Sequence, residues 1–177
     1  MIKNYNKDIL DWDFLPEYDL MWVDPPWQDR MVKWFQSKLL KETGVVDDST
    51  LDAIINKLGE LASSSRPLIV EYSDAGSEHI VSLLVSNGHT FYKKFYCVQS
   101  NNRPFVILVF NSLLDIKTEF KGSQIITETL KSTDCNVILD LFAGIGFTAN
   151  AVIKANKTYI GSEINPKRYS KLIKVNI

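Results

Sequence analysis

Residues 24–27, Asp-Pro-Pro-Trp, form a turn whose composition suits a flat ligand that carries an amino group. Pro25 and Pro26 have no backbone N–H, and each restricts the residue before it to extended dihedral angles. The turn is therefore rigid and presents mainly acceptors, namely the Asp24 carboxylate and backbone carbonyls. An amino group can donate one hydrogen to Asp24 and the other to the Pro25 carbonyl, while its ring stacks on Trp27.

This arrangement can activate an exocyclic amine of adenine, which is a poor nucleophile because its lone pair is delocalised into the ring. Two acceptors aimed at its hydrogens pull the nitrogen towards tetrahedral geometry and free the lone pair to attack a methyl sulfonium in line. Stacking on an aromatic side chain contributes roughly 1–3 kcal/mol per base and helps to hold a nucleotide rotated out of its stack. The competing interpretation is a proline-stiffened turn with Trp27 in the core.

A second stretch, residues 137–163, has the pattern of a nucleoside-binding unit. A β-like run ends at Asp140, and a sharp turn with Gly144 and Gly146 leads into a helix. Glycines let the backbone pass close to a ligand, and the helix N-terminus offers free N–H donors. Glu163, at the end of the next β-like run, can accept hydrogen bonds from ribose hydroxyls. Packing alone is the competing explanation of the glycines.

The nucleoside that suits this turn best is S-adenosylmethionine. The three-glycine fingerprint of dinucleotide binding is absent, because residues 147–149 are Phe-Thr-Ala. Asp140 would repel a pyrophosphate but suits a cation. S-adenosylmethionine has a sulfonium, an ammonium group and no phosphates, so it fits better than NAD.

Short β-like runs alternate with helical stretches, a pattern typical of a parallel sheet covered by helices. The expected strands are residues 2–5, 18–23, 67–72, 90–98, 105–110, 136–141 and 158–162, and the expected helices are 29–41, 49–63, 76–86, 123–132, 148–154 and 166–175. We expect a seven-stranded, mostly parallel sheet with an antiparallel pair at one edge. Ligands bind at the carboxyl ends of such strands, so Asp24 and the glycine turn are expected on one edge.

Composition narrows the class of protein. The 177 residues carry a formal net charge of −1, which argues against nucleic-acid binding through overall charge alone. No apolar run is long enough to span a membrane, and the N-terminus lacks a signal-peptide core, so a cytoplasmic location is expected. Cys97 and Cys135 are expected to be reduced packing residues. His79 and His89 lack ligand spacing, so no metal site is expected.

Basic residues gather in two runs. Arg30, Lys33, Lys38 and Lys41 follow the first motif, and the C-terminal run comprises Lys154, Lys157, Lys167, Arg168, Lys171 and Lys174. Charge runs are usually solvated faces. If both runs lie on one side of the molecule, they make a local phosphate-binding surface.

Together the two motifs resemble those of the amino-methyltransferases that modify exocyclic amines in nucleic acids. Residues 24–27 match that family's motif of Asp, Asn or Ser, two prolines and an aromatic residue. Residues 140–148 match its D-x-F-x-G-x-G-x-T motif, and residues 161–168 match G-x-E-x-N/D-P-x-R/Y. The order, with the catalytic motif first, is the circularly permuted order of the family's β group.

The resemblance implies an α/β, Rossmann-like methyltransferase fold with helices on both faces of the sheet, in a single domain of residues 1–177. In this arrangement strand 2–5 completes the sheet, residues 28–65 form a short helical insertion that can contact the target, and the helix near residues 122–130 lines the methionine end of the cofactor. The implied activity is methyl transfer from S-adenosylmethionine to the N6 amine of adenine in DNA. Asp in the first motif position favours adenine over cytosine N4, where serine is usual.

The resemblance also implies roles for individual residues. The catalytic residues are Asp24, Pro25, Pro26 and Trp27, and the cofactor-binding residues are Asp140, Phe142, Ala143, Gly144, Gly146, Thr148, Glu163 and Asn165. The nucleic-acid contacts are predicted instead from the charge pattern: Arg30, Lys33, Lys38 and Lys41, together with the loop 44–50.

The chain departs from the family pattern in three places. Ile145 and Phe147 replace small or hydroxyl residues of the cofactor turn, and Lys-Gly-Ser at 121–123 stands where Lys-Pro is usual. Only about forty residues separate Trp27 from the strand at Pro67, so no separate target-recognition domain fits there.

Three alternatives remain open at the level of sequence. RNA is a rival substrate because the Asp-Pro-Pro-Trp form also occurs in RNA-modifying relatives. A non-catalytic partner subunit is compatible with the altered cofactor turn, and a nucleotide-binding oxidoreductase is disfavoured by the missing third glycine. A homodimer is compatible with the resemblance, as are roles as a restriction partner or a phage protective enzyme.

Overall fold

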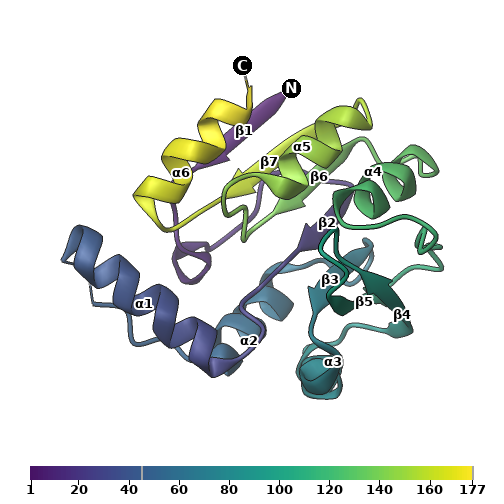
Figure 1. Ribbon diagram of the computed structural model, residues 1–177. Coiled ribbons are helices and arrows are strands. Elements are labelled where there is room, and N and C mark those ends of the chain that lie inside the picture. The colour runs from purple at the N-terminus through teal and green to yellow at the C-terminus, as the bar shows by residue number, and fades with distance from the viewer. Residues whose placement is uncertain (45, 177) are drawn as a thin grey trace.

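A single mixed β-sheet organises the computed structural model, which describes residues 1–44 and 46–176. Within these ranges the sheet has seven strands: β1 (Ile2–Tyr5), β2 (Leu20–Val23), β3 (Leu68–Tyr72), β4 (Phe91–Val98), β5 (Pro104–Phe110), β6 (Val137–Asp140) and β7 (Thr158–Ser162). The helices are α1 (Asp29–Thr43), α2 (Leu51–Leu61), α3 (Ser77–Ser86), α4 (Ser123–Lys131), α5 (Phe147–Lys154) and α6 (Pro166–Leu172) (Figure 1). Short 3₁₀ turns cover Ile9–Asp11, Asp74–Gly76 and Ile173–Asn176.

The strand order is β1-β7-β6-β2-β3-β5-β4. Strand β5 runs antiparallel to both β3 and β4, and the other pairs are parallel. The predicted mostly parallel sheet, with an antiparallel pair at one edge, is confirmed. The N-terminal strand completes the sheet as expected, because β1 pairs with β7 from Ile2 opposite Tyr159 to Tyr5 opposite Ser162.

Helices cover both faces of the sheet, and the strand side chains alternate between them. Met21 and Val23 of β2 pack on one side with α2 and α3, while Leu20 and Trp22 pack on the other with α4 and α5. All four β2 side chains are buried. A strand buried on both faces reads as a continuous apolar run, which is why the sequence indicated it clearly.

Some element boundaries match the predicted ones, and the others differ by one to three residues. Strand β2 begins at Leu20 instead of residue 18, and the Tyr18 backbone carbonyl accepts a hydrogen bond from the Arg66 guanidinium. Helix α2 begins at Leu51, after Thr50 caps it by accepting from the Ala53 N–H at 3.2 Å. Val45, within the loop expected to contact the target, lies outside the described residues.

The cysteines and histidines are accounted for by packing and local hydrogen bonds. Cys97 is buried and Cys135 half-buried, and both are free thiols. His79 lies 2.8 Å from an Asp52 carboxylate oxygen, and His89 lies 2.9 Å from the Gly59 carbonyl. Among the described residues, no cluster of His, Cys, Asp or Glu is arranged to hold a metal ion. No helix within the described ranges is long and apolar enough to cross a membrane.

Candidate active site

A cavity of about 470 Å³ lies at the carboxyl ends of β2 and β6, which are neighbours in the sheet. Its walls come from the turn after β2, the glycine turn after β6, the loop after β7 and the inner side of α1. The structure therefore places the two sequence motifs on one edge of the sheet, as expected. Its volume lies within the range of small-molecule binding sites.

Most of the predicted catalytic and cofactor-binding residues line this cavity: Asp24, Pro25, Pro26, Trp27, Phe142, Ala143, Gly144, Thr148, Glu163 and Asn165. Asp140 and Gly146 are buried and do not line the cavity. The basic residues of α1 are exposed on the outer side of that helix. The cavity also has walls that the sequence did not indicate, formed by Lys7, Asp8, Met31, Phe35, Leu39, Gln99, Arg103 and Arg168. Helix α4, expected at the methionine end of a cofactor, contributes no residue to the lining; residues 99 and 103 of the β4–β5 loop occur instead.

The Asp24 carboxylate is held by the tryptophan three residues later. Trp27 Nε1 donates a hydrogen bond to Asp24 Oδ1 at 2.7 Å. The half-buried Trp27 ring lies nearly parallel to Phe105, with ring centroids 6.5 Å apart and an interplanar angle of 12°. Trp27 therefore orients the acid through its indole N–H and is itself supported by a buried aromatic residue of β5.

Asp24 is exposed to the cavity, while protein surrounds it on its other sides. Burial in these surroundings raises the pKa of Asp24 to about 6, although the Trp27 hydrogen bond and the positive charge of Arg168 act in the opposite direction. At neutral pH the group is therefore mainly a carboxylate, and so mainly an acceptor.

Trp27→Phe is expected to lower kcat by roughly tenfold, because one hydrogen bond to the charged Asp24 is lost while the aromatic ring is kept. The midpoint of the acid limb of the pH–rate profile should move to higher pH, since the lost hydrogen bond lowers the pKa of Asp24. Single-turnover rates of the reaction at this site between pH 5 and pH 9 would test this. An unchanged acid limb would contradict the assigned contact.

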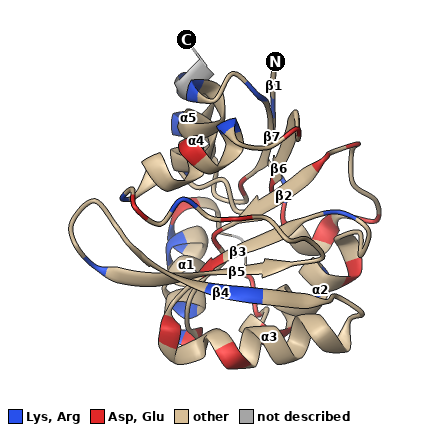
Figure 2. Ribbon diagram, turned by 90° about the vertical axis from the view of Figure 1, so that its right-hand side faces the viewer, with Lys and Arg blue, Asp and Glu red and all other residues tan. Residues whose placement is uncertain are grey.

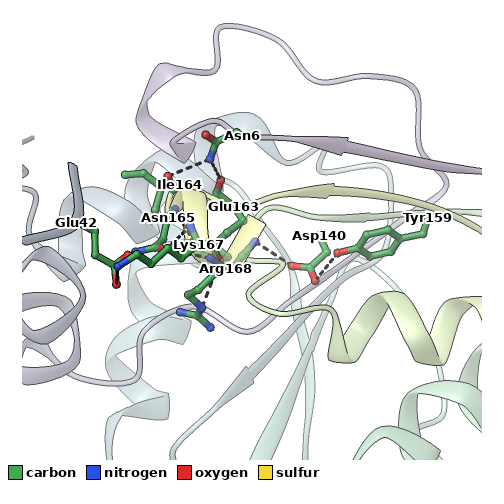
Figure 3. A network of polar contacts seen from close by, with 10 residues as sticks. Asn6, Glu42, Asp140, Tyr159, Glu163, Ile164, Asn165, Lys167 and Arg168 are labelled. Atoms are coloured by element: carbon green, nitrogen blue, oxygen red, sulfur yellow. Dashed lines mark hydrogen bonds and ion pairs between the residues drawn. The ribbon is translucent and has the colours of Figure 1, made fainter. Parts of the chain in front are cut away.

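Asp140 supports the glycine turn from behind. Its carboxylate accepts hydrogen bonds from the Phe142 N–H at 2.9 Å and from the Tyr159 hydroxyl at 3.2 Å (Figure 3). Burial raises the pKa of Asp140 to about 7. The group thus shapes the turn and carries less charge at neutral pH than an ordinary aspartate does. Its expected role in attracting a cation is therefore weakened by its burial.

The turn itself depends on glycine. Gly144 has φ of +57° and Gly146 has φ of +96°, a region that side chains with a Cβ rarely adopt. A Cβ on Gly144 would lie 2.7 Å from the Arg168 guanidinium nitrogen Nη2. Gly144 therefore satisfies both a backbone requirement and a requirement for space at the cavity wall.

Glu163 lines the same cavity beside the glycine turn and is held by a polar network (Figure 3). Its Oε1 accepts the Asn165 backbone N–H at 2.8 Å, and its Oε2 lies 3.8 Å from Arg168 Nε. Its backbone carbonyl accepts from Asn6 Nδ2 at 2.7 Å, which ties the segment after β1 to the site. Burial raises the pKa of Glu163, and the Arg168 charge opposes this shift.

Helix α1 is attached to α6 at the rim of the cavity. Glu42 accepts a hydrogen bond from Asn165 Nδ2 at 2.8 Å and forms an ion pair with Lys167 at 3.5 Å (Figure 3). The Arg168 guanidinium carbon lies 4.9 Å from the centre of the Phe35 ring. The segment 28–65 therefore supplies one wall of the cavity.

Glu71, which sequence reasoning missed, is a second acid near Asp24. Val23 and Val70 are paired between β2 and β3; Asp24 follows Val23 just after β2, and Glu71 follows Val70 within β3. Trp22 Nε1 donates to Glu71 Oε1 at 2.7 Å. Desolvation by the surrounding strands, with a further contribution from the Asp24 charge, raises the pKa of Glu71 to about 8. The protonated form therefore predominates at neutral pH.

Glu71→Gln is expected to stabilise the protein at high pH. The pKa of Glu71 is raised on folding, so wild-type stability falls as pH rises from the ordinary glutamate value to about 8. Glutamine stays neutral and keeps an oxygen for Trp22. The variant's Tm should exceed the wild-type Tm by several degrees at pH 9 and match it at pH 4.5, since 1 kcal/mol corresponds to about 2–4 °C in a protein of this size.

Differential scanning calorimetry at the two pH values measures this difference. The exposed Glu78→Gln serves as the control, because it also removes one negative charge. If the Tm difference between Glu71→Gln and wild type is the same at both pH values, folding does not raise the pKa of Glu71.

No protein-family model matches the sequence, and no curated protein matches it. Among solved structures, M1.HpyAVI is similar with a TM-score of 0.68 and 17% identity, over 100% of both chains. M1.HpyAVI in its complex with SAM has a TM-score of 0.69 and 15% identity, over 99% of this chain and 98% of that one. The PvuII DNA methyltransferase, which is cytosine-N4-specific, has a TM-score of 0.66 and 11% identity, over 99% of this chain and 86% of that one.

The fold is a methyltransferase fold. The predicted fold class is therefore confirmed, including the seven-stranded sheet with helices on both faces. In this methyltransferase fold the Asp24 turn follows β2 and the glycine turn follows β6, so the two motifs stand in permuted order along the chain.

Proposed function

We propose that this protein transfers a methyl group from S-adenosylmethionine to the N6 amine of adenine in DNA. The observation that carries the proposal is the position of Asp24. Its carboxylate, oriented by Trp27 at 2.7 Å, opens into the same cavity as the Gly144 turn and Glu163. An amine acceptor and a nucleoside-binding turn thus share one space.

The residues present fit S-adenosylmethionine. Gly144 leaves room at the wall where a Cβ would collide with Arg168, and the Glu163 carboxylate faces the cavity as an acceptor for ribose hydroxyls. Phe142 and Ala143 line the same turn. The bound compound supplies an activated methyl group on a sulfonium.

The protein's own part in the reaction is to orient the amine and receive its proton. Asp24 and the Pro25 carbonyl accept the two amine hydrogens, and this draws the nitrogen lone pair out of the ring. When the nitrogen takes the methyl group, the methyl–sulfur bond breaks, sulfur becomes a neutral thioether, and the positive charge passes to the nitrogen. Asp24 then takes up the proton that the nitrogen loses, and its raised pKa makes it a better proton acceptor than an ordinary aspartate.

The proposal treats residues 1–177 as one methyltransferase domain. Its target contact is the segment 28–65, through the basic residues Arg30, Lys33, Lys38 and Lys41 of α1. The similarity to DNA methyltransferases supports DNA as the substrate. Asp in the first position of the motif supports adenine. The PvuII enzyme acts on cytosine N4, so both bases belong in the test.

The decisive experiment incubates the protein with methyl-labelled S-adenosylmethionine and unmethylated DNA or RNA oligonucleotides, followed by digestion to nucleosides. We expect label in N6-methyladenine from DNA. Label in N4-methylcytosine would overturn the choice of base, and label in RNA alone would overturn the choice of nucleic acid. Cofactor binding by calorimetry without any transfer would instead identify a non-catalytic partner subunit.

A further inference from the structure

The two basic runs of the sequence meet at the rim of the cavity. Glu42 of α1 contacts Asn165 at 2.8 Å and Lys167 at 3.5 Å, and both partners belong to the start of α6. Arg168 of α6 lies over Phe35 of α1. Residues more than a hundred positions apart therefore form one surface beside the candidate active site.

The outer face of α1 combines positive charge with an exposed indole. Arg30, Lys33, Trp34, Ser37, Lys38 and Lys41 are spaced by alternating steps of three and one residues, which places them on one side of the helix, and all are exposed. Figure 2 shows basic positions recurring along α1. We call this set of six residues the α1 face. Two acids of α1 flank this face: Glu42 is paired with Lys167 of α6, and Asp29 is exposed in the first turn.

Trp34 is the unusual member of the α1 face. Its side chain is 52% exposed, so the ring is accessible to a ligand on the outer side of α1. Lys38 Nζ lies 4.1 Å from the centre of the Trp34 ring. An aromatic ring among cations is the combination that binds nucleic-acid strands, because the ring stacks on bases and the cations contact phosphates.

Trp34 is connected to the cavity through one residue. Its ring meets the Phe35 ring edge-on, with centroids 4.9 Å apart. Phe35 lines the cavity and carries Arg168 on its ring. An aromatic wall therefore runs from the cavity to the outer face of α1. A nucleotide beside one held in the cavity would meet this wall.

We propose that the α1 face binds single-stranded DNA, with a base next to the target stacked on Trp34 and phosphates on the flanking lysines and Arg30. In a duplex the flat faces of the bases are covered by their neighbours, whereas a single strand offers them freely. The inference rests on the proposed function, because it takes the nucleotide in the cavity to be the methylation target.

The test is fluorescence anisotropy with a labelled 12-nucleotide single strand and the matching duplex, using the full chain. We expect the single strand to bind at least tenfold more tightly than the duplex. Trp34→Ala should weaken single-strand binding about tenfold, while Trp34→Phe keeps most of it. Affinity for S-adenosylmethionine and the Tm should be unchanged in both variants, which shows that they fold.

Tyr96→Ala provides a matched control, because Tyr96 is also exposed and has Lys94 Nζ 5.6 Å from its ring, but it lies on β4 and does not line the cavity. This variant should change affinity less than twofold. Equal affinity for duplex and single strand, or full binding by Trp34→Ala, overturns the inference. If the protein methylates a duplex and Trp34→Ala has no effect on strand binding, only this inference is wrong. If Trp34→Ala weakens strand binding but no methyl transfer is detected, only the proposed function is wrong.

Discussion

Asp24→Ala is expected to lower kcat for the proposed methyl transfer by roughly 10³-fold or more, while affinity for S-adenosylmethionine is kept. The substitution removes the acceptor that draws on the amine lone pair and the group that takes up its proton. It also leaves the Trp27 indole N–H without its partner at 2.7 Å. Folding should be retained, because Asp24 is exposed to the cavity and its ionised form is disfavoured there.

Single-turnover kinetics with saturating S-adenosylmethionine measures this loss, and calorimetry measures cofactor affinity. Asp24→Asn is the matched control, because it keeps the shape and one acceptor oxygen, which Trp27 and the substrate amine must share. Its kcat should lie between those of wild type and Asp24→Ala. If Asp24→Ala keeps more than a tenth of wild-type activity, the acid does not act on the amine.

Gly144→Ala is expected to weaken binding of S-adenosylmethionine by roughly 10- to 100-fold. The new methyl group would lie 2.7 Å from Arg168 Nη2, so the guanidinium must move at the cavity wall. Alanine at a φ of +57° also strains the turn, at a cost of about 1 kcal/mol. The strain lowers the stability of the fold, and the displaced guanidinium weakens binding of S-adenosylmethionine.

Gly88→Ala separates these two effects. Gly88 has φ of +88°, and a Cβ there would meet nothing within 4 Å. This variant should lose a similar amount of stability and bind the cofactor like wild type. Isothermal calorimetry and thermal denaturation of both variants measure the two quantities. Equal cofactor affinity in Gly144→Ala and Gly88→Ala would place the ligand away from this turn.

Local sequence determined the elements and the two turns of the candidate site. The apolar runs around β2 and β6 predicted buried strands, because strands covered on both faces need no polar positions. Asp24 and Gly144 follow those strands directly, and ligands bind at the carboxyl ends of parallel strands, so their position on a shared edge follows from the residue order. The roles of Pro25 and Pro26 follow from covalent geometry alone.

The tertiary structure decided the contacts between side chains that are far apart along the chain. The stacking of Trp27 on Phe105 and the closeness of Glu71 to Asp24 depend on which strands are neighbours, and periodicity does not encode strand order. Helical spacing placed the cations of α1 on one side of the helix. Which side of α1 faces the cavity depends on the packing of its apolar residues and on the contacts of Glu42 with α6. Those long-range contacts bring Trp34 to the rim of the site, a position that no local pattern in the sequence specifies.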